Sequence, residues 1–265
     1  MKTIYRSLVL LLTITLLFST TVLAKNDNAK KSLLALGDSI PYGYNLGEDN
    51  DSPSKDAFPY LIGDDKNMRV RNLAVPGWRT DQLLDAVENE QKFRQAIKQA
   101  DAITLNIGNN DLLQALAVAN AESGGDPFWF NYHLQDQINK SNLFENLGSI
   151  VAEIRSLTDA PIVIYNVYNP FQVNDTLHDI GQLVLPGINQ SFGHVISGLN
   201  GIYGDAFVAD AYGAFGTNQA EYVIAGDIHP TVEGQKKLAE VGNDVLESLF
   251  DSKKGNSKPE KAIKR

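Results

Sequence analysis

The sequence predicts an α/β protein built on a mainly parallel β-sheet, and two observations carry this prediction. Five short runs of apolar, β-favouring residues recur along the chain: Ser32–Leu36, Val70–Leu73, Ala102–Ile107, Pro161–Val167 and Ala206–Ala209. The segments between these runs have helical periodicity, which is the alternation that repeated βαβ units produce. Without the first segment of the chain, roughly 240 residues remain, enough for one domain with a sizeable core.

The first predicted strand is apolar from Leu33 to Leu36 and then breaks into Gly37, Asp38 and Ser39. A strand covered on both faces reads as such a run, and α/β folds bind their ligands at the carboxyl ends of parallel strands. Ser39 is therefore a candidate functional residue. The same serine could instead be the N-cap of a following helix.

Two of the intervening helices are clear from their apolar stripes. Residues 142–157 place Leu143, Leu147, Ile150, Val151, Ile154 and Leu157 on one face, and Asn142 with Glu145 predicts a cap pair. Residues 231–250 begin with Thr231 as a predicted cap and bury Leu238, Val241, Val245 and Leu249. This helix should close the domain near Phe250.

Two stretches fit the alternation poorly. Residues 112–135 join an apolar run to a Gly-Gly break and an aromatic cluster of Phe128, Trp129, Phe130 and Tyr132, and residues 174–200 are interrupted by Pro186. Long excursions after the strands of an open sheet often cover the site, so we expect both to roof it.

The two ends of the chain differ from the part between them. Lys2 and Arg6, an apolar run from Leu8 to Phe18 and a small residue at Ala24 predict a signal peptide over residues 1–24 and a secreted, extracellular protein. The alternative is an uncleaved anchor, for which the run is short. We expect the domain to cover residues 31–250. A basic, disordered tail is predicted over residues 251–265, either without a role or weakly attracted to an anionic surface.

Composition excludes several functions. The chain has no cysteine, so disulfides, thiolate metal ligands and a cysteine nucleophile are all absent. Its 23 basic and 32 acidic residues give a net charge of −9, and cleavage of the signal would remove two basic residues, leaving −11. Phosphate binding needs a basic footprint, so nucleic acid is not an expected partner. We expect the protein to be a monomer.

Four short segments at predicted strand ends carry chemistry. They are "GDSIPYGY" with Ser39, "NLAVPGWRT" with Gly77, "NIGNND" with Asn110, and "AGDIHPT" with Asp227 and His229. Acyl transfer by serine needs a nucleophile, a nearby base and hydrogen-bond donors for the developing oxyanion. The backbone N–H groups of Ser39 and Gly77 and the side-chain amide of Asn110 are the candidate donors.

Each residue also has a plainer interpretation. Gly77 after Pro76 could simply form a type II turn, Asn110 could cap a loop, and His229 before Pro230 could be an ordinary loop histidine. Together, in this order and at strand ends, they favour the catalytic interpretation.

These four segments resemble the sequence blocks of the SGNH (GDSL) hydrolase family, over roughly residues 31–250. The resemblance implies a flavodoxin-like three-layer α/β/α fold with a five-stranded sheet. Ser39 matches the family's nucleophile, Gly77 the glycine of its second block, Asn110 the asparagine of its third block, and His229 its base. Gly108 and Asp111 complete the third block. A secreted bacterial esterase or lipase is the implied protein.

One departure from the family pattern concerns the acid of the triad. The family usually places it three residues before the histidine, where this chain has Gly226, and Asp227 lies only two residues before. On an extended backbone a carboxylate at that distance points to the same side as the imidazole. Asp227 is therefore the candidate acid. The alternative is a Ser–His dyad in which a backbone carbonyl orients His229.

Metal catalysis is the competing enzyme class. His133, His178, His194 and His229 have no pair at ligand spacing, so we predict no metal site and no cofactor. His133 and His194 are predicted to be ordinary core or surface residues.

The acyl group is not determined by such a motif set. Leu112, Leu113, Leu116 and Val118, with the aromatic cluster, could form an apolar wall for an acyl chain, or could simply bury their helix. We expect a small-molecule or lipid ester as substrate, with an esterase or lipase of fatty-acyl esters as the main hypothesis. The alternatives are an O-acetylesterase acting on polysaccharide or cell-wall glycan, and a non-catalytic binding module.

Overall fold

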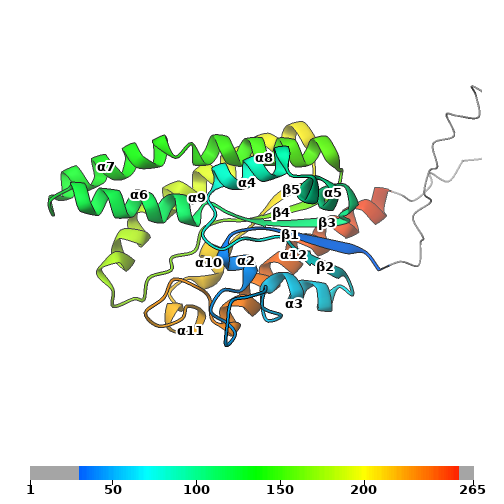
Figure 1. The fold of residues 1–265 in the computed structure, drawn as a ribbon, viewed down its shortest axis with the longest axis horizontal. Coiled ribbons are helices and arrows are strands. Elements are labelled where there is room, and N and C mark those ends of the chain that lie inside the picture. Colours follow the sequence, from blue (N-terminus) through cyan, green and yellow to red (C-terminus); the bar gives the residue numbers. More distant parts are fainter. Residues whose placement is uncertain (1–29, 257–265) are drawn as a thin grey trace, which may run out of the picture. The chain divides into compact units, whose positions relative to one another are not determined.

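A five-stranded parallel sheet forms the centre of the protein (Figure 1). The computed structural model describes residues 30–256. The strands are β1 Ser32–Gly37, β2 Arg69–Asn72, β3 Ala102–Asn106, β4 Ile162–Tyr165 and β5 Ala206–Ala209. Their order is β2-β1-β3-β4-β5, which is the flavodoxin-like order. The predicted fold class is confirmed, and each predicted strand lies within two residues of an observed one.

Helices cover both faces of the sheet. They are α2 Ser39–Tyr42, α3 Phe58–Asp65, α4 Thr80–Asn89, α5 Gln91–Gln99, α6 Asn109–Glu122, α7 Pro127–Lys140, α8 Leu143–Leu157, α9 Thr176–Tyr203, α10 Ala211–Phe215, α11 Gln219–Tyr222 and α12 Val232–Asn256. Neighbouring strand residues point to opposite faces. Leu34 packs in a core with α4, α5, α8 and α9, whereas Leu33 packs in a second core with α3 and α12.

The order of strands fixes where a site can form. The chain runs from β1 outward to β2 and then crosses back to β3, so the loops after β1 and β3 leave the same edge of the sheet side by side. This reversal creates the crevice in which open α/β sheets bind ligands. Ser39 follows β1 and Asn110 follows β3.

The clear predicted helices are present, but their caps differ. The Thr231 hydroxyl accepts a hydrogen bond from the N–H of Gly234 at 3.0 Å, as expected of a cap. Asn142 precedes α8 with φ 53° and makes no capping hydrogen bond, so that cap prediction is wrong. Helix α12 continues past Phe250 to Asn256. The predicted signal peptide and the rest of the predicted tail lie outside the described residues.

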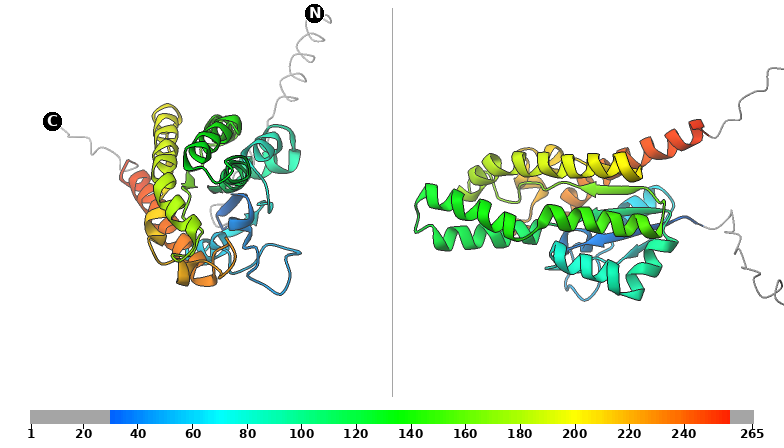
Figure 2. Two further views of the ribbon diagram at one scale, coloured as in Figure 1. Left: turned by 90° about the vertical axis from the view of Figure 1, so that its left-hand side faces the viewer. Right: turned by 90° about the horizontal axis from the view of Figure 1, so that it is seen from above.

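Residues 112–135 and 174–200, which fit the alternation of strands and helices poorly, are mostly helical. Residues 109–140 form a hairpin of α6 and α7 joined at Gly124 and Gly125, and α9 continues through Pro186 as one helix. Figures 1 and 2 show the hairpin and the first half of α9 extending past the carboxyl ends of the strands. The excursions thus roof the candidate site, as predicted. Among residues 30–256, no helix is both long and apolar enough to cross a membrane.

Candidate active site

Ser39 opens a short helix at the end of β1. It is the first residue of α2, but the cap of that helix is Asp38, whose carboxylate accepts from the N–H of Ile40 at 3.0 Å. The interpretation of Ser39 as an N-cap is therefore wrong. Its side chain stays available for another partner although only 7% of the residue is exposed.

That partner is His229. Ser39 Oγ lies 3.0 Å from His229 Nε2, and His229 Nδ1 lies 2.7 Å from Asp227 Oδ1. The three residues form a continuous hydrogen-bonded line that joins two segments 190 residues apart in sequence. A base in this position can take the serine proton, and a carboxylate behind it can hold the imidazole tautomer. The structure thus brings together all three residues proposed from the sequence.

A bent loop, rather than an extended strand, places Asp227 beside His229. Val223 and Pro230 form an isolated antiparallel bridge, and the N–H of Ile224 donates to the carbonyl of His229 at 2.9 Å. Gly226 has φ 75°, in the left-handed region that favours glycine. An acid at position 226, where the family usually has it, would be strained there. Asp227, one position later, provides the carboxylate instead.

Two residues that the sequence analysis missed support this line. Asn45, in the loop after α2, donates from Nδ2 to Asp227 Oδ2 at 2.7 Å. Tyr168, after β4, donates its hydroxyl to the carbonyl of Ile228 at 2.7 Å. Asn45 follows the Gly-Asp-Ser segment by a few residues, but no local signal connects it with an acid 182 residues later.

The hydrogen bonds on Asp227 determine its charge. Partial burial alone would raise its pKa, but hydrogen bonds from Asn45, Ile228 and His229 outweigh burial, so the pKa lies below its ordinary value. Asp227 is therefore an anion at neutral pH, in the state needed to stabilise an imidazolium.

The candidate oxyanion donors other than Ser39 come from the segments that follow β2 and β3. Gly77 has φ 81°, and a side chain added there would meet open space, so only the backbone conformation calls for glycine. Asn110 is the second residue of α6 and donates one amide hydrogen to the carbonyl of Trp78, the neighbour of Gly77, at 2.9 Å. Its second amide hydrogen remains for a ligand. The hydrogen bonds of the described residues include none from the N–H of Ser39 or Gly77.

A buried polar network lies behind the serine. Asp38 is fully buried and accepts from Asn109 Nδ2 at 2.9 Å as well as from Ile40. Burial raises the pKa of Asp38 to about 7, although these hydrogen bonds oppose the shift. Asp111 accepts from the N–H and the hydroxyl of Thr80, at 3.0 and 2.7 Å. Asp38 thus connects the segment after β1 to the start of α6, and Asp111 connects the start of α6 to the start of α4.

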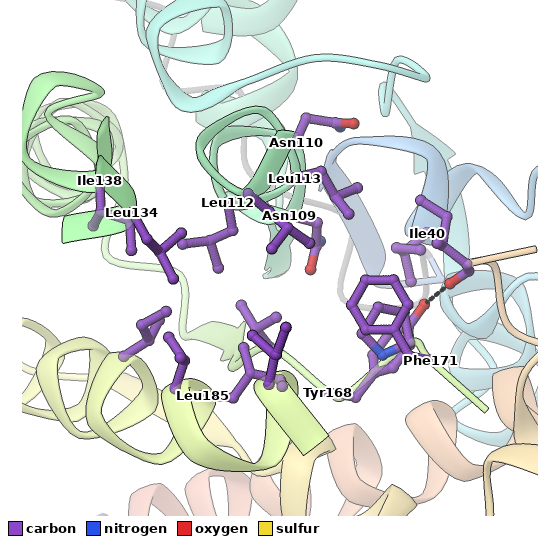
Figure 3. A pocket seen from close by; sticks show the side chains of 18 of the residues that line it. Ile40, Asn109, Asn110, Leu112, Leu113, Leu134, Ile138, Tyr168, Phe171 and Leu185 are labelled. Carbon is purple, nitrogen blue, oxygen red and sulfur yellow. Dashed lines mark hydrogen bonds between the residues drawn. The ribbon is translucent and has the colours of Figure 1, made fainter. Parts of the chain in front are cut away.

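An apolar pocket opens onto Ser39 (Figure 3). Its empty volume is about 720 Å³ including the open mouth. Besides Ser39, Asn109 and Asn110, its lining is mostly aliphatic, from α6, α7 and α9: Leu112, Leu113, Leu116, Leu134, Ile138, Ile180, Val184, Leu185 and Ile188. The predicted apolar wall is therefore present in part. Val118 does not line the pocket, and neither does the aromatic cluster, because Phe128, Trp129 and Tyr132 are exposed on the other side of α7.

The other histidines lie elsewhere. His133 pairs with Glu122 at 3.1 Å, His194 is exposed, and His178 is buried with Nδ1 2.8 Å from the carbonyl of Phe171. Among the described residues, no group of three or more histidine and acidic side chains could hold a metal ion.

Comparison with known proteins gives a family and relatives. The profile of the GDSL-like Lipase/Acylhydrolase family matches residues 35–237. The chain is 29% identical over 167 residues to the uncharacterized protein YpmR of Bacillus subtilis, a match covering 62% of this chain and 60% of that protein. It is 26% identical over 208 residues to the spore germination lipase LipC of Bacillus licheniformis, covering 78% and 92% of the two chains.

A solved structure has the same fold. The lipase Lip_vut3 from a goat rumen metagenome superimposes with a TM-score of 0.65 at 25% identity, covering 82% of this chain and 97% of that one.

Proposed function

Because the chain belongs to the GDSL-like lipase/acylhydrolase family, we propose that it is a serine hydrolase that cleaves carboxylic esters of fatty acids through an acyl-enzyme. Ester hydrolysis follows from the family and its lipase relatives. The single observation that supports a fatty-acyl substrate is the aliphatic pocket that opens onto Ser39. An acyl chain in this pocket would bring its carbonyl carbon to the serine.

The proposed first step forms the acyl-enzyme. Ser39 Oγ attacks the ester carbonyl while its proton passes to His229 Nε2, 3.0 Å away. The negative charge that develops on the carbonyl oxygen is stabilised by the N–H groups of Ser39 and Gly77 and the free amide hydrogen of Asn110. Asp227 stabilises the imidazolium, which then gives its proton to the departing alcohol.

The second step returns the enzyme to its first state. Water enters the position of the alcohol and loses its proton to His229 Nε2 as it attacks the acyl carbon. The second tetrahedral intermediate expels Ser39, which recovers the proton, and the fatty acid leaves. Asp227 keeps its charge through both steps because its pKa is low.

The two alternatives predict different surroundings for the serine. An O-acetylesterase needs space for only two acyl carbons, whereas this pocket runs from Ser39 along α6 to residues of α7 and α9. A non-catalytic binding module would not need a base within hydrogen-bond distance of the serine. We also propose that the protein is secreted after cleavage near Ala24, on the basis of its N-terminal sequence.

Substrate profiling tests this function. The purified protein is assayed on p-nitrophenyl esters from acetate to palmitate and on acetylated xylan. We expect the highest kcat/KM on esters longer than acetate, and phosphonate labelling at Ser39. Ser39→Ala should lose turnover by about 10⁴-fold or more while keeping its thermal midpoint. Activity confined to acetylated xylan would favour the alternative enzyme, and an unlabelled, inactive wild-type protein would favour the binding module.

A further inference from the structure

Three aromatic side chains stand exposed near the turn of the α6–α7 hairpin. Phe128, Trp129 and Tyr132 are 70%, 49% and 56% exposed, and we call them the aromatic tip. Trp129 makes edge contacts with both others, with ring centroids 5.3 and 5.7 Å apart. Large exposed apolar groups that gather in one place mark an interaction surface rather than ordinary surface variation.

The tip belongs to the helix that also forms the pocket. Leu134 and Ile138 line the acyl pocket from α7, on the side opposite to the aromatic tip. Across the pocket, Leu183 of α9 is 76% exposed next to Val184 and Leu185, which line it. Both walls of the pocket therefore carry exposed apolar groups. Figures 1 and 2 show that the turn between α6 and α7 is the part of the hairpin that lies farthest from the sheet.

Charge indicates what this surface meets. The sequence has no lysine or arginine between Lys98 and Lys140, nor between Arg155 and Lys236. These gaps include α6, nearly all of α7 and the whole of α9. The charged residues near the tip are acidic, such as Asp126, which caps α7, and Glu122, which pairs with His133. An anionic surface would be repelled here, whereas a neutral surface would not.

We propose that the aromatic tip docks the protein on an electrically neutral lipid surface, from which an ester lipid places its acyl chain in the pocket. This inference rests on the proposed function for the role of the pocket, but the docking itself does not depend on catalysis. Tryptophan and tyrosine favour the boundary between water and acyl chains because their rings are apolar with one polar group. Phenylalanine adds apolar area to the contact.

Fluorescence from Trp129 tests the docking at the residue concerned. The full chain carrying Ser39→Ala is mixed with phosphatidylcholine vesicles whose acyl chains bear bromine, so that no lipid is consumed. We expect the Trp129 emission to shift to shorter wavelength and to be quenched. The Trp129→Phe variant in the same background retains only Trp78, and the difference between the two isolates the signal of the tip. Unquenched Trp129 would overturn the proposal.

Two variants with matched exposure separate the tip from other apolar residues. Phe128→Ala should raise the lipid concentration needed for half-maximal quenching by about tenfold, because burial of one large apolar side chain shifts partitioning by that order. Ile202→Ala should change it little. Ile202 is 73% exposed, but it lies near the other end of α9, about 28 Å along the helix from Leu183. Equal effects of the two variants would contradict docking by the tip.

Two further measurements, one with anionic lipid added and one of oligomeric state, distinguish docking by the aromatic tip from other contacts. Adding phosphatidylglycerol should not strengthen Trp129 quenching, and a stronger, salt-sensitive signal would assign docking to the basic C-terminal segment instead. A dimer lost in Phe128→Ala, without quenching by lipid, would show that a second copy covers the tip. Wild-type hydrolysis of soluble p-nitrophenyl butyrate, measured in parallel, tests the proposed function separately: activity without quenching overturns the docking alone.

Discussion

The carboxylate of Asp227 lies 2.7 Å from Nδ1 of His229, although a single residue separates the two in the chain. The bent loop between Val223 and Pro230 makes this possible, and the amide of Asn45 holds the other carboxylate oxygen at 2.7 Å. Because the acid is displaced by one position from the family's usual place, its contribution is the point most worth measuring.

Asp227→Asn should reduce kcat by on the order of 10³–10⁴-fold, because an amide favours the wrong imidazole tautomer and cannot stabilise the imidazolium. His229→Ala should be at least as damaging, and the double variant should lose little more, since the pair acts as one unit. Glu221→Gln and Glu233→Gln, two exposed acids nearby, are the controls. Near-native kcat in Asp227→Asn with an inactive His229→Ala would establish a Ser–His dyad.

Asn45 should act through Asp227. Asn45→Ala removes one hydrogen bond to a partly exposed carboxylate, so kcat should fall by about three- to tenfold. Asn45→Asp adds a negative charge beside the Asp227–His229 pair, which favours binding of a proton by the pair, so the acid limb of the kcat/KM profile should move to higher pH. Asn89→Ala, which removes a similar bond from an exposed amide to Asp85 Oδ1 on α4, is the control. An unmoved acid limb in Asn45→Asp would remove Asn45 from the mechanism.

Asn110→Ala should lower kcat by roughly 10²–10³-fold with little change in KM, because the amide acts mainly on the tetrahedral intermediate. Gln114→Ala, an exposed change on the same helix, should leave both constants near their wild-type values. Steady-state kinetics on one soluble ester separates the two parameters. A raised KM with unchanged kcat would make Asn110 a residue that positions the substrate.

The far end of the pocket should set acyl-chain length. Figure 3 shows Leu134 and Ile138 at the end of the pocket opposite Ile40, which follows Ser39. Ile138→Phe adds volume there, so kcat/KM should fall for palmitate esters and stay nearly constant for acetate and butyrate. Ile138→Val serves as the control for a small change at the same buried position. Equal losses on all chain lengths would show that acyl chains do not reach Ile138.

Asp38 should make folding stability depend on pH. Its pKa of about 7 in the folded protein lies above its ordinary value of 3.8, so the folded state binds the extra proton between these pH values. The stabilisation is complete below about pH 4 and is lost as pH rises through about 7, by up to about 4 kcal/mol in the free energy of unfolding.

Urea unfolding of Asp38→Asn across this pH range checks the assignment. The variant should lack the decline, whereas Asp56→Asn, at an exposed position, should keep it. A decline of equal size in Asp38→Asn would place its origin in other groups.

Local sequence determined the sheet and much of the site. The strands were readable because residues buried on both faces must be apolar, and helix α8 because its apolar stripe repeats with the helical period. Ser39, Gly77 and Asn110 could be proposed because each follows a strand, where the fold places ligands. The expectation that His229 also lies at a strand end is wrong, because α10 and α11 separate it from β5, and its segment was identified by its residues alone.

Tertiary structure decided the remainder, because contacts between distant segments leave no periodic signal. Pro186 reads as a break, yet α9 continues through it because Leu185, Ile188 and Phe192 are buried against the rest of the domain. Phe128, Trp129 and Tyr132 were expected to form an acyl-chain wall or to bury their helix, but they are exposed, since Leu134 and Ile138 occupy the inner face of α7. Asn45 and Asp227 lie 182 positions apart in the sequence, so the place of Asn45 beside the acid is set by the fold and by no local pattern.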